Sequence, residues 1–133
     1  MSDNKKTAAQ IIGKHGEDIA ADYLTKKGLN VISRNFHTRY GEIDIIANDS
    51  QYIIFAEVKT RNEFAVATPS EWVDKRKQKK LMMTAAIYLQ NNPTDLQPRF
   101  DVVEVVLAKG SQELVSINHI ENAFIQEDGY AAF

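Results

Sequence analysis

Three charged residues, Asp44, Glu57 and Lys59, lie within two largely apolar runs, GEIDIIA at residues 41–47 and YIIFAEVKTR at residues 52–61. Carboxylate oxygens are the ligands that Mg²⁺ prefers, and the ion commonly takes one or two carboxylates and leaves its other positions to water and phosphate oxygens. An ion held there can act as a Lewis acid, orient an attacking water and stabilise charge on a phosphate. A nearby lysine can hold that water or neutralise the transition state. If the two acids meet, these residue types predict metal-dependent phosphodiester chemistry.

The pairing of the two runs decides whether the acids meet. The connecting residues 48–51 (NDSQ) are turn formers, so we expect an antiparallel hairpin. If the hairpin closes symmetrically between Ser50 and Gln51, Asp44 lies opposite Glu57, and cross-strand partners project to one face with Cβ atoms about 5 Å apart. A slip of one residue would place the acids on opposite faces of the sheet. Alternation along the first run assigns Glu42, Asp44 and Ile46 to one face and Ile43, Ile45 and Ala47 to the other.

The same residues also allow a purely structural interpretation. An acid followed two residues later by lysine is a weak pattern, and Glu42 and Glu57 could form solvated surface pairs with Lys59, each worth less than about 1 kcal/mol. Two like charges opposed across a sheet are unfavourable, however, and a cation removes that repulsion. Ile53 and Phe55 share the face of Glu57, so this face is partly apolar, which favours the cation site.

Helices and further strands are expected around the hairpin. Residues 7–27 show helical periodicity, with Glu17 on the rim of the apolar stripe and Gly28 at the C-terminal cap. A second helix is expected over residues 74–91 with Asp74 as its cap, and residues 68–71 (TPSE) offer an alternative start. Further strands are expected at residues 29–36, 100–107 and 113–117, and a terminal helical turn at residues 120–125. The order α-β-β-β-α-β-β predicts an α/β fold with a mixed central sheet and helices packed against it.

The composition is that of one globular domain. The 133 residues are 44% hydrophobic and 26% charged, and we expect a single domain over residues 1–133, frayed at 1–6 and ending in a tail at 127–133. The absence of cysteine excludes disulfide frameworks, thiolate metal sites and a cysteine nucleophile. No apolar run approaches the roughly 20 residues of a membrane helix, and the start MSDNKKTAAQ lacks a signal-peptide core, so we expect a cytoplasmic protein with no membrane partner. The net charge of −2 argues against non-specific nucleic-acid binding over the whole surface but permits a local basic face.

Several separated motifs resemble one family. They are Gly-Glu at residues 16–17, GEIDII at 41–46, EVK at 57–59 followed by Arg61, a lysine-rich helix start, and RFDVV at 99–103. This combination, covering about residues 13–125, resembles the YraN-type family of small bacterial proteins of uncharacterised function. That family is similar to the PD-(D/E)XK nuclease superfamily and to archaeal Holliday-junction resolvases. The resemblance implies a restriction-endonuclease-like αβββαβ core with a mixed central sheet flanked by helices.

The resemblance also implies roles for individual residues. Asp44 and Glu57 match the two metal-binding acids of the superfamily, Lys59 matches its lysine, and Glu17 matches the glutamate of the first helix that completes the metal site in the resolvase-like branch. The implied cofactor is Mg²⁺ or Mn²⁺. The proline that strictly precedes the first acid in the superfamily pattern is replaced here by Ile43, a departure that leaves the ligands themselves in place.

Basic residues outside the hairpin are candidates for contacts with the nucleic-acid backbone. Lys75 and Lys79 lie one turn apart at the start of the second helix, where cations oppose the helix dipole and where phosphate recognition would explain their placement. A solubilising face explains them equally well. Arg61 follows the EVK motif, and Arg39 belongs to a basic and aromatic cluster just before GEIDII. Asp101 shares a strand face with Arg99, so we expect this pair to be structural.

These observations predict a magnesium-dependent endonuclease-like protein that hydrolyses phosphodiester bonds in structured or branched DNA. By analogy with junction resolvases we expect a homodimer. An alternative is a nucleic-acid-binding or assembly module that keeps the nuclease fold and does not cut. A third interpretation is a partner of another enzyme, with Trp72 and the tail at residues 130–133 as contact points.

Overall fold

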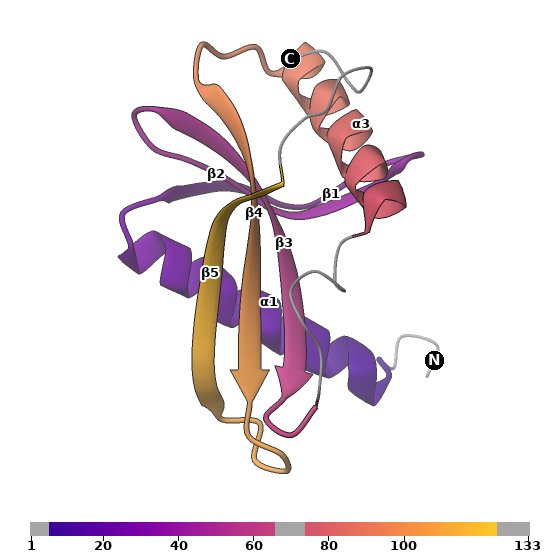
Figure 1. Ribbon diagram of the computed structural model, residues 1–133, viewed down its shortest axis with the longest axis vertical. Coiled ribbons are helices and arrows are strands. Elements are labelled where there is room, and N and C mark those ends of the chain that lie inside the picture. The colour runs from indigo at the N-terminus through magenta and orange to yellow at the C-terminus, as the bar shows by residue number, and fades with distance from the viewer. Residues whose placement is uncertain (1–5, 66–73, 125–133) are drawn as a thin grey trace.

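The computed structural model describes residues 6–65 and 74–124 and has an α/β fold built on one five-stranded sheet. The order of elements is the predicted α-β-β-β-α-β-β, and α1 crosses behind β3, β4 and β5 (Figure 1). The elements are α1 (Ala8–Lys26), β1 (Asn30–Thr38), β2 (Gly41–Asn48), β3 (Tyr52–Asn62), α3 (Lys75–Asn91), β4 (Gln97–Leu107) and β5 (Leu114–Phe124).

The sheet is mixed, as the sequence predicts. Its strand order is β1-β2-β3-β4-β5, so neighbours in sequence are neighbours in space. β3 and β4 run parallel and the other pairs are antiparallel. A parallel pair needs a crossover connection, and the segment containing α3 supplies it. This architecture is compatible with the restriction-endonuclease-like fold.

The first helix is fixed at its start by a capping box and in its middle by a close approach to the sheet. The Thr7 hydroxyl accepts from the Gln10 N–H, and the Gln10 side chain accepts from the Thr7 N–H. Gly16 is buried, and a Cβ added to it would lie 1.9 Å from Thr60 Oγ1 on β3. The helix backbone can therefore pack directly on β3 only because residue 16 has no side chain.

The second helix begins where Asp74 predicts. The Asp74 carboxylate accepts from the Lys77 N–H at 2.9 Å, which caps the helix start. The alternative start at residues 68–71 lies outside the described residues. Leu81, Met82 and Ala85 are buried and face the sheet.

Each face of the sheet carries its own apolar cluster. Ile45, Ala47, Ile54 and Ala56 pack with the α1 side chains Ala20 and Leu24. Ile46, Ile53 and Phe55 pack with the α3 side chains Leu81, Met82 and Ala85. The two helices therefore cover opposite faces, and the charged end of the hairpin lies between them.

The predicted face of Ile43 is wrong. Strict alternation places it with Ile45, whereas it packs in the α3 cluster beside Ile46. The described pairing of β2 with β3 ends at Ile45, and beyond this point β2 follows β1. Ile43 pairs there with Phe36, which packs against the same α3 cluster.

The last strand also differs from expectation. β5 runs unbroken from Leu114 to Phe124, so the helical turn expected from residue 120 is wrong over residues 120–124. Register shifts against β4 and the positive φ of Asn122 (53°) explain why its sequence does not alternate cleanly.

Trp72 and the expected N-terminal and C-terminal flanks lie largely or wholly outside the described residues. None of the helices in the described part of the chain combines the length and apolar character needed to cross a bilayer.

Candidate active site

The hairpin closes in the register that brings the two acids together. Ile45 pairs with Ala56 and Ile46 with Phe55, which is the symmetrical closure predicted from the turn. At Asp44, the residue before Ile45, a side chain joins the two strands. The Val58 N–H on β3 donates to Asp44 Oδ2 at 2.8 Å. The end of the β2–β3 ladder is thus formed by the carboxylate of Asp44.

Asp44 and Glu57 form a buried carboxyl pair. Their exposed fractions are 8% and 6%, and their side chains are hydrogen-bonded to each other. Burial raises the pKa of Asp44 to about 9, with the hydrogen bond and the negative charge of Glu57 adding to the effect. Burial alone would raise the pKa of Glu57 too, but the hydrogen bond from Asp44 and the contact with Lys77 outweigh it and lower that pKa. Near neutral pH the pair therefore holds one proton, on Asp44, and one negative charge, on Glu57.

Two lysines meet the charged member of this pair. Lys77 Nζ contacts Glu57 Oε2, and Lys59 Nζ lies 3.5 Å from the same oxygen. Burial lowers the pKa of Lys59, and the positive charge of the neighbouring Lys77 lowers it further. Burial opposes the charge of Lys77 as well, but the hydrogen bond to Glu57 outweighs it and raises the pKa of Lys77. The firmly charged ammonium at Glu57 is therefore that of Lys77.

Lys77 is the site residue that sequence reasoning missed. We expected Lys75 and Lys79 to be the functional lysines of this helix, and both are exposed. Lys77 lies one turn before Leu81, so it continues the stripe that faces the sheet. That position within an otherwise solvated lysine run is the signal that could have identified it.

A cleft of about 550 Å³ opens beside the carboxyl pair, between the two helices. Glu17 enters it from α1, and its half-buried side chain confirms the predicted rim position. Burial raises the pKa of Glu17, partly offset by Arg34 at 3.8 Å and by a hydrogen bond with Asn35. The charged residues that line the cleft are Glu17, Glu42, Asp44, Glu57, Lys77 and Lys80.

The donor chemistry of the cleft suits a hard divalent cation. Asp44 and Glu57 offer two adjoining carboxyl groups at a solvent-reachable cleft, and Glu17 faces the same space. Within residues 6–65 and 74–124, no group of three His, Asp or Glu side chains is arranged to hold an ion. The carboxyl pair therefore supplies two suitable donor groups, and the participation of Glu17 as a third ligand stays a prediction.

The predicted nucleic-acid contacts lie in different surroundings. Lys75 and Lys79 are exposed on the first turns of α3, and the Arg39 guanidinium stacks 5.0 Å from the centre of the Tyr40 ring. Arg61 is held inward, because its Nε lies 2.5 Å from Glu104 Oε2 and its Nη1 donates to the Ala65 carbonyl at 2.8 Å. The contribution of all four residues to nucleic-acid binding stays a prediction.

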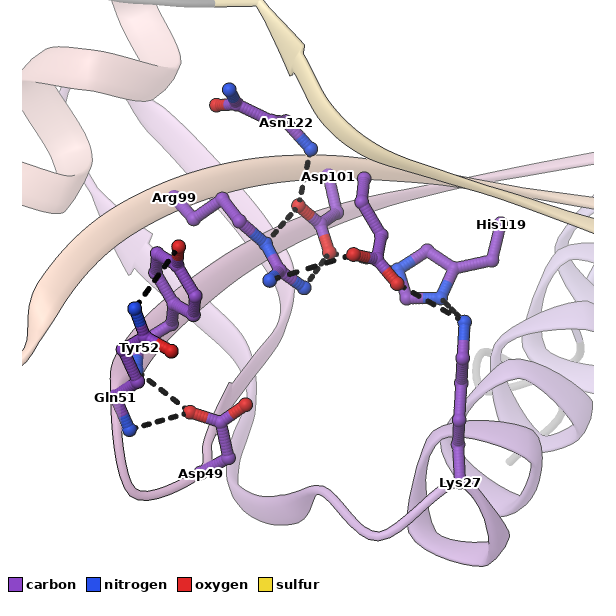
Figure 2. A network of polar contacts seen from close by, with 9 residues as sticks. Lys27, Asp49, Gln51, Tyr52, Arg99, Asp101, His119 and Asn122 are labelled. Atoms are coloured by element: carbon purple, nitrogen blue, oxygen red, sulfur yellow. Dashed lines mark hydrogen bonds and ion pairs between the residues drawn. The ribbon is translucent and has the colours of Figure 1, made fainter.

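A second charged cluster, at Asp101, is structural. Figure 2 shows Arg99, His119 and the main-chain nitrogen of Asn122 converging on the Asp101 carboxylate. Arg99 binds it through two nitrogens at 2.9 and 2.8 Å, which confirms the expected pair. His119 of β5 lies 2.8 Å from the same carboxylate and 2.8 Å from Lys27 Nζ. Since an ammonium can only donate, His119 accepts at Nδ1 and donates from Nε2 to Asp101.

Comparison with known proteins identifies relatives of this chain. Residues 16–105, which include Glu17, Asp44, Glu57 and Lys77, match the model of "Uncharacterised protein family UPF0102". A UPF0102 protein from Caldanaerobacter subterraneus is 45% identical over 121 residues, covering 90% of this chain and 99% of the relative. UPF0102 proteins from Rhodococcus opacus and Clostridium botulinum are 40% and 44% identical, each over 85% of this chain and over 95% and 93% of their own lengths. The chain thus belongs to the uncharacterised protein family UPF0102.

Proposed function

We propose that the chain is a Mg²⁺- or Mn²⁺-dependent endonuclease that hydrolyses phosphodiester bonds in structured or branched DNA. The observation that carries this proposal is the buried pair of Asp44 and Glu57, brought together by the strand register beside a cleft and contacted by two lysines. Keeping one of two buried carboxyl groups protonated at neutral pH costs the fold stability. A binding role for these oxygens accounts for their placement.

The fold and the motifs support membership in the PD-(D/E)XK superfamily as part of the same proposal. The αβββαβ order, the GEIDII and EVK motifs and the glutamate on the first helix occur in the arrangement that the resemblance implies. Membership in UPF0102 does not by itself indicate an activity. The proposed activity therefore rests on the chemistry of the cleft.

Asp44, Glu57, Glu17 and Lys59 have distinct parts in the proposed reaction. Asp44 and Glu57 would hold the ion, and Glu17 of α1, which lines the same cleft, would be the third candidate ligand. A bound Mg²⁺ or Mn²⁺ would act as a Lewis acid toward the scissile phosphate and lower the pKa of an attacking water. Lys59 would hold that water or neutralise the charge that develops on the phosphate oxygens. Burial lowers the pKa of Lys59, which favours its role in holding the attacking water.

The substrate contacts are proposed on charge and position. Lys75 and Lys79 on α3 and Arg39 before β2 would contact the phosphodiester backbone, as would Arg61 if it exchanges Glu104 for phosphate. A homodimer, by analogy with junction resolvases, would place two such clefts on the two strands of a branched substrate.

A cleavage assay on defined DNAs tests the proposal. Purified protein is incubated with branched, nicked, duplex and single-stranded DNA in Mg²⁺ or Mn²⁺, and products are resolved on denaturing gels. We expect metal-dependent cleavage that Asp44→Ala with Glu57→Ala abolishes. Asp22→Asn, an exposed carboxylate paired with Lys26 on α1, is the matched control and should cleave normally. Cleavage that survives the double substitution would contradict the assignment.

A second candidate function is nucleic-acid binding without cleavage. The observation that favours it is the absence of an assembled three-ligand group among the described residues. Metal-independent DNA binding, with no cleavage under any cation, would support this alternative. A titration with salt would then count the phosphate contacts. The interpretation as a protein partner that uses Trp72 and the C-terminal tail concerns residues outside the described part of the chain.

A further inference from the structure

The ammonium of Lys77 contacts an oxygen of Glu57, one of the two proposed metal ligands. Lys77 Nζ contacts Glu57 Oε2, and Lys59 approaches the same oxygen to 3.5 Å. The carboxyl group of Asp44 has little remaining capacity to coordinate a metal ion. Its Oδ2 accepts from the Val58 N–H, and the group is also hydrogen-bonded to Glu57. In this conformation, the negative charge of the carboxyl pair is already neutralised by a cation from the chain itself.

An ammonium and a divalent ion compete for the Glu57 carboxylate. A magnesium ion binds its oxygen ligands at about 2.0–2.1 Å and requires near-octahedral geometry around itself. Lys77 carries the same sign of charge and approaches the same carboxylate oxygen. The two cations repel each other at Glu57, so binding of the ion favours movement of the Lys77 ammonium away from it.

Lys77 is better placed to move than the other lysine. It lies on the first turn of α3, its side chain is 40% exposed, and its four-carbon stem can reach solvent without movement of the helix. Lys59 lies on β3, a strand paired with β4 along its length, and its side chain is 31% exposed. After release, Lys77 would still be at the cleft, which it lines with Lys80. A phosphate group entering there would offer it a new partner.

We propose that Lys77 is an internal competitor for the metal ion, occupying Glu57 in the metal-free protein and leaving it when the ion binds. This inference rests on the proposed metal-dependent function and adds its regulation. The ion binds weakly to the protein alone, because it competes with Lys77 for Glu57. DNA phosphate favours metal binding by accepting the released ammonium.

Metal binding to the protein without DNA tests this role independently of activity. Mn²⁺ affinity is measured by isothermal titration calorimetry for the wild type, Lys77→Gln, Lys77→Met and Lys80→Gln. Lys80 lines the same cleft from the same helix, so Lys80→Gln removes an equal charge and controls for long-range electrostatics. We expect both Lys77 variants to bind Mn²⁺ at least about tenfold more tightly than the wild type, and Lys80→Gln to change affinity by less than about threefold.

The other outcomes separate this inference from the function on which it rests. Equal tightening in the Lys77 and Lys80 variants, or weaker binding in the Lys77 variants, would overturn the competitor role while leaving a metal site. Absence of Mn²⁺ binding in the wild type and in every variant would overturn both the competitor role and the metal-dependent function. Circular dichroism on each variant checks that the fold is retained, which the exposure of Lys77 leads us to expect.

Discussion

Replacing Asp44 by asparagine should stabilise the metal-free protein, and the gain should grow as the pH rises. Asparagine has the shape of a protonated aspartate and can keep both of its hydrogen bonds. Its carbonyl oxygen can accept from the Val58 N–H, and its amide can donate to Glu57. Unlike aspartate, it needs no proton to do so. The variant therefore removes the cost of keeping a carboxyl protonated at neutral pH.

The size of this effect follows from the pKa of Asp44. Folding raises that pKa from 3.8 to about 9, so between these values the folded state holds a proton that the unfolded chain has released. The stability that Asp44 contributes is fully present below its unfolded pKa and is lost as the pH rises toward the folded one. The limiting loss is about 1.4 kcal/mol per pH unit, or about 4 kcal/mol between pH 5 and pH 8. Because the carboxyl can also relax toward water in the cleft, we expect about half of this limit.

Chemical denaturation measures the predicted change. Free energies of unfolding are determined in urea for the wild type and Asp44→Asn at pH 5, 6, 7 and 8, with EDTA present. The difference between the two proteins removes the contribution of titrating groups that do not contact Asp44 and reports the titration of the Asp44–Glu57 pair. We expect the difference to change by about 2 kcal/mol in favour of the variant between pH 5 and pH 8. Parallel stability curves for the two proteins would refute the shared-proton description of the pair.

Three further predictions concern the glycines of α1, the Asp101 cluster and the exposed lysines of α3. Gly16→Ala should destabilise the fold by about 2 kcal/mol or more, because a Cβ there would overlap β3. Gly13→Ala on the same helix meets nothing within 4 Å and should stabilise it by about 0.5–1 kcal/mol; thermal melts compare the two. Asp101→Asn should cost about 3 kcal/mol at pH 7, because it removes the buried carboxylate that Arg99 binds through two nitrogens. Since folding lowers the pKa of Asp101 below 3.8, the deficit should begin to shrink as the pH falls below that value, and a deficit that does not change with pH in acid would contradict this. Lys75→Gln with Lys79→Gln should weaken DNA binding equally for all sequences and reduce the slope of log affinity against log salt by up to about 2; an unchanged slope would exclude both lysines as phosphate contacts.

The sequence predicted the central pairing because several local signals agree there. The NDSQ turn and the alternation of the two flanking runs favour a single register, and the structure adopts it. The same signals placed Ile43 on the wrong face, because alternation holds only while β2 pairs with β3. Where the ladder ends, local pattern no longer determines the direction of a side chain.

The parts that sequence reasoning missed depend on contacts between distant elements. Lys77 meets Glu57 only because α3 packs across the hairpin, and within a run of lysines only its spacing from Leu81 sets it apart. His119 meets Asp101 through a β4–β5 register that contains shifts, which no local spacing reveals. Helix caps and turns are local and could be read from the sequence, whereas charge partners between elements required the assembled fold.

Anomalous scattering from Mn²⁺ soaked into crystals of the protein tests the central claim most directly, because it locates the ion whatever the substrate is. We predict one peak within coordination distance of both Asp44 and Glu57, lost in the Asp44→Ala, Glu57→Ala variant. Peaks only at other carboxylates, or none at a Mn²⁺ concentration in the millimolar range, would contradict the assignment of this pair as the metal site.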